Sequence, residues 1–236
     1  KLPFNDETFD FVWCNGVIHH TQEPDKSLRE LIRILKIKGQ SFIYVYGSGG
    51  IYWWFVDKIR TYLKKIKVKD LMQYLVKLNY SKRFIGEYLD DWKVLHLRKY
   101  TNKNFLSSLK NLGIIKIKKL NRGLTYDTSE RLYRGDSNIL FGEGDLRYLI
   151  TKDKKIKKNK KKFLANSSKH ISTRLIEAMY KGLLNKLFYL KHSNLTKVTI
   201  CAKIQNKLRN LMNKKGRFDQ KEFTSFLNKM FTHLTQ

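Results

Sequence analysis

The sequence is poor in the residues that would mark several classes of protein. Its 236 residues include two cysteines, Cys14 and Cys201, and two prolines. Two cysteines so far apart exclude a disulfide framework and fit a reducing compartment, so we expect a cytoplasmic protein. No apolar run approaches the roughly 18 residues that span a bilayer, so we expect no transmembrane segment. We also expect no metal site, because the adjacent His19 and His20 have no third ligand near them in sequence.

Acidic residues are scarce as well. The chain has 20 Asp and Glu against 49 Lys and Arg, a net charge of +29. Residues 1–50 hold six residues of each sign, whereas residues 151–236 hold 22 basic and four acidic residues. The charge permits a nucleic-acid partner but does not favour one, because many Lys, Ile and Asn with only three Ala also indicate AT-rich coding.

The first fifty residues predict a strand, a helix and a second strand. Phe9–Cys14 is a short apolar run typical of a buried strand. Pro24 suits a first helical turn, and Gly39 is placed to end the helix as its C′ residue. Ser41–Tyr46 is a second apolar run. The helix between them carries its apolar residues at i, i+3, i+4 and i+7, namely Leu28, Leu31, Ile32 and Leu35. The pattern predicts a βαβ unit with parallel strands.

The rest of the chain predicts further elements around a linker. Residues 51–100 have a helical period, are rich in aromatic residues and are too long for a connection, so we expect a helical insertion. A helix over 102–112 and strands over 114–120 and 146–150 should complete the first domain, residues 1–151. Lys152–Lys162 holds eight Lys in eleven residues and predicts a solvated linker, and residues 163–236 predict a helical tail.

Two motifs resemble those of a known family. The segment Leu2–His20, LPFNDETFDFVWCNGVIHH, resembles the fourth-strand region of class I S-adenosylmethionine-dependent methyltransferases of type 11. In that family a Leu-Pro-Phe turn precedes a Phe-Asp strand, which ends in a Val/Leu-x-His element. Arg33–Gly39, RILKIKG, is similar to the family motif Arg-Val-Leu-Lys-Pro-Gly-Gly, although Ile37 stands where proline is usual and Lys38 where the first glycine is usual. The similarity is specific over residues 2–47 and looser over 100–122.

The resemblance implies an α/β, Rossmann-like sheet, S-adenosylmethionine as the cofactor and methyl transfer as the activity. Ligands of open parallel sheets lie beyond the carboxyl ends of the strands. It therefore implies cofactor contacts in the turn after the first strand, from Asn15, Gly16, Val17 and His20. The family's glycine-rich first-strand loop and its ribose-binding acidic residue have no counterpart in this sequence. We therefore expect the carboxyl-terminal portion of a methyltransferase, which binds the cofactor poorly or not at all by itself.

Alternatives remain for each candidate residue. His20 is the candidate for a general base; alternatively, one imidazole of His19–His20 packs under the turn and the other faces solvent. Candidates for binding the acceptor are Tyr46, Tyr52, Trp53 and Trp54, since this family usually builds acceptor specificity from insertions after its fifth strand. Alternatively, the aromatic cluster at 52–54 packs between helices.

We expect a small-molecule or saccharide-type acceptor. The rival interpretation is a basic nucleic-acid-binding module or an RNA-directed methyltransferase, for which affinity for RNA would fall steeply with salt.

Overall fold

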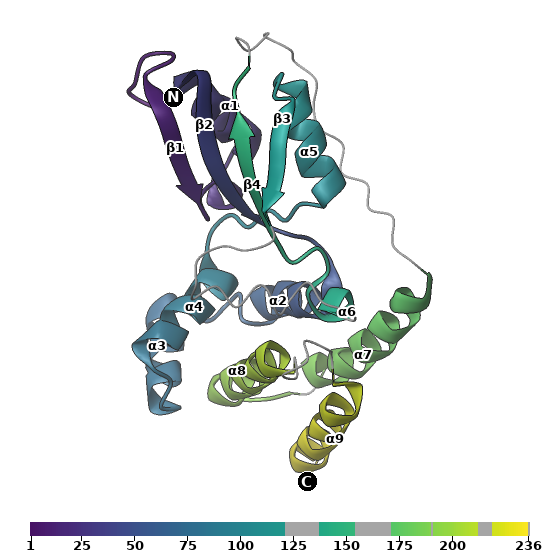
Figure 1. Cartoon of the computed structure of the whole chain (residues 1–236). Helices are drawn as coiled ribbons and strands as arrows, with labels where there is room; N and C mark the ends of the chain where they lie inside the picture. Colours follow the sequence, from purple (N-terminus) through teal and green to yellow (C-terminus); the bar gives the residue numbers. More distant parts are fainter. Residues whose placement is uncertain (121–136, 154–170, 190, 212–218, 236) are drawn as a thin grey trace. The chain divides into compact units, whose positions relative to one another are not determined.

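The structure is a computed structural model that describes residues 1–120, 137–153, 171–189, 191–211 and 219–235 (Figure 1). The chain divides into two compact units. Unit 1 comprises Lys1–Ser48, Leu95–Glu130 and Glu143–Ser168. Its elements are β1 (Phe9–Asn15), the short 3-10 helix η1 (Ile18–His20), α1 (Pro24–Ile34), β2 (Leu35–Tyr46), α5 (Asn102–Asn111), β3 (Lys116–Leu120) and β4 (Asp145–Thr151).

The described strands of unit 1 form one sheet in the order β1-β2-β4-β3. β1 and β2 are parallel, and β4 runs antiparallel to both of its neighbours (Figure 1). The predicted βαβ unit and the α/β fold are therefore confirmed, as are the helix before Gly113 and the strand within 146–150.

Helices α1 and α5 pack on the same face of this sheet. Strand residues alternate between the two faces, so every second side chain points to the helices. The apolar core that results joins the two helices to three strands through Leu28, Leu31, Ile32, Phe105, Leu109, Cys14, Ile43, Val45, Leu146, Tyr148 and Ile150. On the opposite face, Phe11 and Trp13 are about half exposed, and Trp13 stacks on Phe42 with 4.1 Å between ring centroids.

The predicted role of Gly39 as the helix C′ residue is wrong. α1 ends at Ile34 and β2 begins directly at Leu35, so Gly39 lies inside a strand. A Cβ at Gly39 would come within 2.9 Å of the carbonyl oxygens of Asp10 and Lys36, so the position requires glycine for close backbone approach. The left-handed residue is the preceding Lys38, whose φ is 67°.

Lys152, which the sequence places in a solvated linker, is buried. Its side chain donates from Nζ to the carbonyl oxygen of Leu35 at 2.6 Å and pairs with Glu7 at 3.4 Å. Its backbone N–H donates to the carbonyl oxygen of Gly39 at 3.0 Å, which extends the contact between β2 and the end of β4. The prediction is therefore wrong for this residue, and the run beyond Asp153 lies outside the described residues.

Unit 2 is helical throughout its described residues. It comprises Gly49–Val94, Arg131–Gly142 and Lys169–Gln236. Its helices are α2 (Gly50–Tyr62), α3 (Val68–Lys77), α4 (Lys82–Lys93), α6 (Ser137–Phe141), α7 (Ile171–Tyr189), α8 (Asn194–Asn210) and α9 (Gln220–Thr235). No described helix is long and apolar enough to cross a membrane. The helical character expected of the insertion and the tail is confirmed, and the division at residues 151 and 162 stays a prediction.

Candidate functional site

The parallel strands β1 and β2 end beside each other at one edge of unit 1. Asn15 pairs in register with Tyr44, so the turn after β1 lies next to the last residues of β2. The segment before α5 crosses this edge: the N–H of Tyr100 donates to the carbonyl oxygen of Tyr46 at 2.9 Å, and the N–H of Ser48 donates back to that of Tyr100 at 2.7 Å. The edge is thus built from three chain segments.

The structure brings the four predicted cofactor-binding residues together at this edge. Asn15 and Val17 are exposed, Val17 by 56%, while Gly16 and His20 are half-buried. Gly16 has a φ of 76°, the left-handed region that glycine adopts without strain. A Cβ there would meet only the ring of Tyr44, at 3.8 Å, so the turn conformation, not crowding, explains the glycine.

His20 is held in one tautomer. Its Nδ1 lies 3.1 Å from the carbonyl oxygen of His96. A carbonyl oxygen can only accept, so this hydrogen bond requires the ring proton on Nδ1, and the neutral ring then has its lone pair on Nε2. This is the tautomer that can take a proton at Nε2, as a general base must.

His19 is the buried member of the histidine pair at this edge. It is fully buried, and neither ring nitrogen has a hydrogen-bond partner among the described residues. Its ring packs on Tyr46 with 4.0 Å between centroids and on His20 with 4.2 Å. Burial, with a smaller contribution from His20, lowers the pKa of His19 to about 3, so the imidazole is neutral at physiological pH. The adjacent histidines match the alternative in which one ring packs under the turn.

The rings of His19, Tyr44 and Tyr46 pack on one another along β2, and we call these three residues the aromatic wall. Tyr44 and Tyr46 lie 5.7 Å apart in an edge-to-face arrangement, and the guanidinium of Arg147 lies 4.8 Å from the Tyr44 ring. Arg147 also pairs with Asp145 at 3.1 Å. Burial, and to a lesser degree the charge of Asp145, raises the pKa of the Tyr44 phenol well above its usual value. The wall is therefore neutral apart from a balanced ion pair.

Arg33 links the two motifs that carry the family resemblance. Its guanidinium donates to the carbonyl oxygen of Phe4 at 2.8 Å and of Leu2 at 3.2 Å, so it fixes the Leu-Pro-Phe turn. It also pairs with Asp6 and Glu30, each at 2.8 Å. Hydrogen bonds from Arg33 lower the pKa of Glu30 to about 2. The arginine of the second motif thus holds the start of the first in place.

The other predicted acceptor-binding residues belong to unit 2. Tyr52 and Trp53 are buried in α2, with 5.2 Å between ring centroids, and Trp54 is half-buried. The Tyr52 hydroxyl donates to Asp91 at 2.7 Å and accepts from Gln205 at 3.0 Å and Arg209 at 3.1 Å. These contacts agree with the alternative in which the cluster packs between helices.

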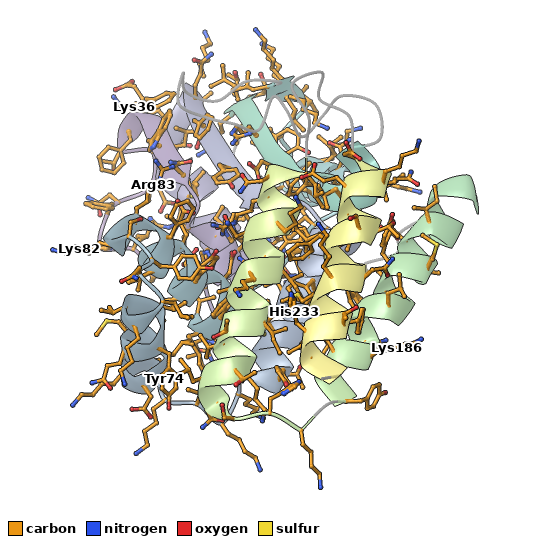
Figure 2. The ribbon with its side chains drawn as sticks, turned by 90° about the horizontal axis from the view of Figure 1, so that it is seen from below. Lys36, Tyr74, Lys82, Arg83, Lys186 and His233 are labelled. Atoms are coloured by element: carbon orange, nitrogen blue, oxygen red, sulfur yellow. The ribbon has the colours of Figure 1, made fainter. Side chains whose placement is uncertain are left out.

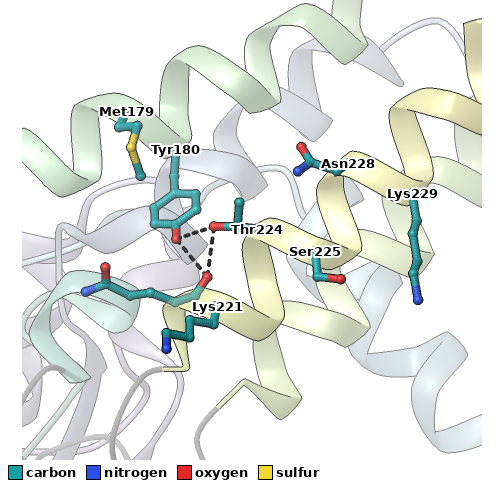
Figure 3. A pocket seen from close by; sticks show the side chains of 8 residues that line it. Met179, Tyr180, Lys221, Thr224, Ser225, Asn228 and Lys229 are labelled. Atoms are coloured by element: carbon teal, nitrogen blue, oxygen red, sulfur yellow. Dashed lines mark hydrogen bonds between the residues drawn. The ribbon is translucent and has the colours of Figure 1, made fainter.

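An open cavity of about 610 Å³ lies between α7 and α9 of unit 2 (Figure 3). The Tyr180 hydroxyl lies 3.0 Å from Thr224 Oγ1 and donates to the carbonyl oxygen of Gln220, and Lys221 and Lys229 stand at the rim. None of the predicted site residues lines it. Among the described residues, no group of three or more His, Cys, Asp or Glu side chains is placed to hold a metal ion.

Comparison with known proteins identifies the segment that builds this edge. The methyltransferase domain family matches residues 1–43. No curated protein matches the chain. A Haloferax volcanii methyltransferase solved with the Trm112 methyltransferase activator is 13% identical, with a TM-score of 0.35, over 64% of this chain and 57% of the other. A SAM-dependent methyltransferase from Thermotoga maritima is 16% identical, with a TM-score of 0.35, over 64% of this chain and 60% of the other.

PKMT2 from Rickettsia typhi, solved with AdoHcy, is 14% identical, with a TM-score of 0.38, over 100% of this chain and 58% of the other. The chain thus spans 57% to 60% of the length of these three structures. With TM-scores this low, the assignment rests on the family match. The family match at residues 1–43 covers β1, α1 and most of β2, the part of the chain in which the resemblance over residues 2–47 lies.

Proposed function

We propose that the protein transfers a methyl group from S-adenosylmethionine to a small-molecule or saccharide-type acceptor, and that residues 1–151 form the carboxyl-terminal part of its catalytic domain. The observation that carries the proposal is the position of the family segment: it supplies β1, the turn after β1 and most of β2, the two parallel strands that end at this edge. In open α/β sheets this is the edge at which ligands bind.

The residues of the edge fit one side of this cofactor. Val17 offers an exposed apolar surface and Asn15 an exposed amide, which suit the flat face and polar rim of a purine. The family's ribose-binding acidic residue and its glycine-rich loop have no counterpart in this sequence. The ribose and methionine parts then require residues outside this edge.

The chain's own contribution to the reaction is positioning and proton removal. When bound, the cofactor supplies an electrophilic methyl group, so the protein chiefly aligns the acceptor and excludes water. We assign His20 as the base for acceptors that must lose a proton, because its Nδ1 contact with His96 leaves the lone pair on Nε2. Tyr46 lies beside it, with 5.6 Å between ring centroids, and forms the acceptor side. Acceptor roles for Tyr52, Trp53 and Trp54 stay a prediction.

Binding of S-adenosylhomocysteine to the whole protein tests this assignment. Val17→Lys should weaken binding at least about tenfold, because the ammonium must be desolvated or displaced where the ligand packs. Val76→Lys on α3 is the matched control, since Val76 is 57% exposed and Val17 56%. Calorimetric titration should give the wild-type affinity for the control. Unchanged affinity in Val17→Lys, or an equal loss in both variants, would contradict the assignment.

A further inference from the structure

Helix α3 in unit 2 is apolar over a wider arc than its neighbours cover. Successive helical residues are about 100° apart, so residues i, i+4 and i+8 form a slowly turning stripe. Leu71 and Leu75 are fully buried against the rest of the unit. Val68, Met72 and Val76 form a second stripe beside them and are 52%, 44% and 57% exposed. We call these three residues the α3 stripe.

Basic residues are frequent in α3 and in the segments on either side of it. Residues 61–84 hold seven Lys and Arg and one acidic residue, Asp70. All seven are exposed: Lys64, Lys65, Lys67, Lys69, Lys77, Lys82 and Arg83. Figure 2 shows Lys82 and Arg83 projecting from the start of α4 on the side of the unit where Tyr74 of α3 lies. Phe84, the next residue of α4, adds a further apolar side chain that is 38% exposed.

We propose that α3 lies on an anionic phospholipid surface, with the α3 stripe entering the headgroup layer and the surrounding lysines contacting lipid phosphates. An exposed apolar stripe flanked by lysines is the pattern of helices that lie in the plane of a membrane interface. Each Lys or Arg near an anionic leaflet adds to the attraction.

The positive charge around α3, taken together with its apolar stripe, favours a lipid surface over the other possible partners. A second copy would bring two sets of seven basic residues together, so repulsion disfavours self-association. An acidic protein or an RNA would satisfy the lysines, but each would leave aliphatic side chains at the centre of a charged interface. A lipid headgroup layer satisfies both, because phosphates lie directly above an apolar layer.

Co-sedimentation of the full chain with vesicles tests the proposal. The chain should bind vesicles of equal parts phosphatidylcholine and phosphatidylglycerol at least about tenfold more tightly than phosphatidylcholine alone, and salt should weaken the binding. Met72→Glu should weaken binding to the anionic vesicles at least about tenfold, because it places a carboxylate where an apolar group should insert. Met179→Glu on α7 is the matched control, since Met179 is 51% exposed, and should bind as wild type.

A double variant, Lys67→Gln with Lys69→Gln, should also weaken binding to the anionic vesicles while leaving the apolar stripe intact. Circular dichroism of each variant should match the wild type, because every substituted residue is exposed. Three results would overturn the proposal: no binding to anionic vesicles, equal losses in Met72→Glu and Met179→Glu, or binding of RNA or of a second copy through the α3 stripe with no vesicle binding.

Discussion

His19 should make unit 1 sensitive to mild acid. The imidazole is fully buried, and its pKa is lowered from 6.5 to about 3 in the folded chain. Between these values the unfolded chain binds a proton that the folded chain does not. The unfolding free energy therefore falls as pH falls. The loss of unfolding free energy is negligible well above pH 6.5 and grows progressively as the pH falls towards 3.

The size of the effect follows from the width of this window. Each pH unit between the two pKa values removes up to about 1.4 kcal/mol. Acidification from pH 6.5 to two units lower should thus cost unit 1 about 2–3 kcal/mol through His19 alone. His19→Phe keeps an aromatic ring against Tyr46 and has no ionisable group, so it should remove this part of the acid sensitivity. It also removes two buried nitrogens that have no hydrogen-bond partner among the described residues, which should raise stability at neutral pH by about 1–3 kcal/mol.

Urea titrations that follow the backbone amide signals of Ile43 and Val45 by NMR measure this in unit 1, because both residues lie in its core. The difference between wild type and His19→Phe cancels the contributions of other titrating groups. The variant should have the higher unfolding free energy throughout, and the difference between the two proteins should grow as pH falls through the window. Parallel curves from neutral pH down to pH 4 would refute the burial of a neutral His19.

Two further predictions concern packing and backbone conformation. Asp91→Ala should destabilise unit 2 by about 3–5 kcal/mol in urea titrations, because Asp91 accepts from Tyr52, Gln205 at 2.6 Å and Arg209 at 3.0 Å, and its loss leaves buried donors without this partner. Lys38→Gly should stabilise unit 1 by up to about 1 kcal/mol, because Lys38 holds a left-handed φ of 67°; a thermal unfolding midpoint below that of wild type would contradict this.

Local pattern was sufficient to predict the elements that position the site. Apolar runs indicated β1 and β2, and the spacing of Leu28, Leu31 and Ile32 indicated the buried face of α1, because both signals depend on neighbours in sequence. The parallel pairing of β1 and β2 then followed from the length of the connection. The four residues Asn15–Val17 and His20 could be placed at one edge for the same reason.

Features that depend on distant contacts were not visible in the sequence. Lys152 belongs to a run of lysines, yet Leu35 and Glu7, more than a hundred residues away, bury it. The position of Gly39 in the sequence predicts a helix end, but the structure requires glycine there because the backbone of Asp10 on the neighbouring strand approaches it closely. The exposure of the α3 stripe could not be predicted because it depends on which side chains of α3 the rest of unit 2 covers. The burial of the His19 ring without a hydrogen-bond partner among the described residues likewise depends on the side chains that pack against it, such as Tyr46.

The most direct test of the central claim, that the edge after β1 and β2 binds the methyl donor, is photochemical cross-linking of tritiated S-adenosylmethionine to the whole protein, followed by peptide mapping. Label should appear in the peptide that contains Asn15–His20, and excess unlabelled S-adenosylhomocysteine should abolish it. Competable label confined to the helices of unit 2, or no competable label anywhere in the protein, would contradict it.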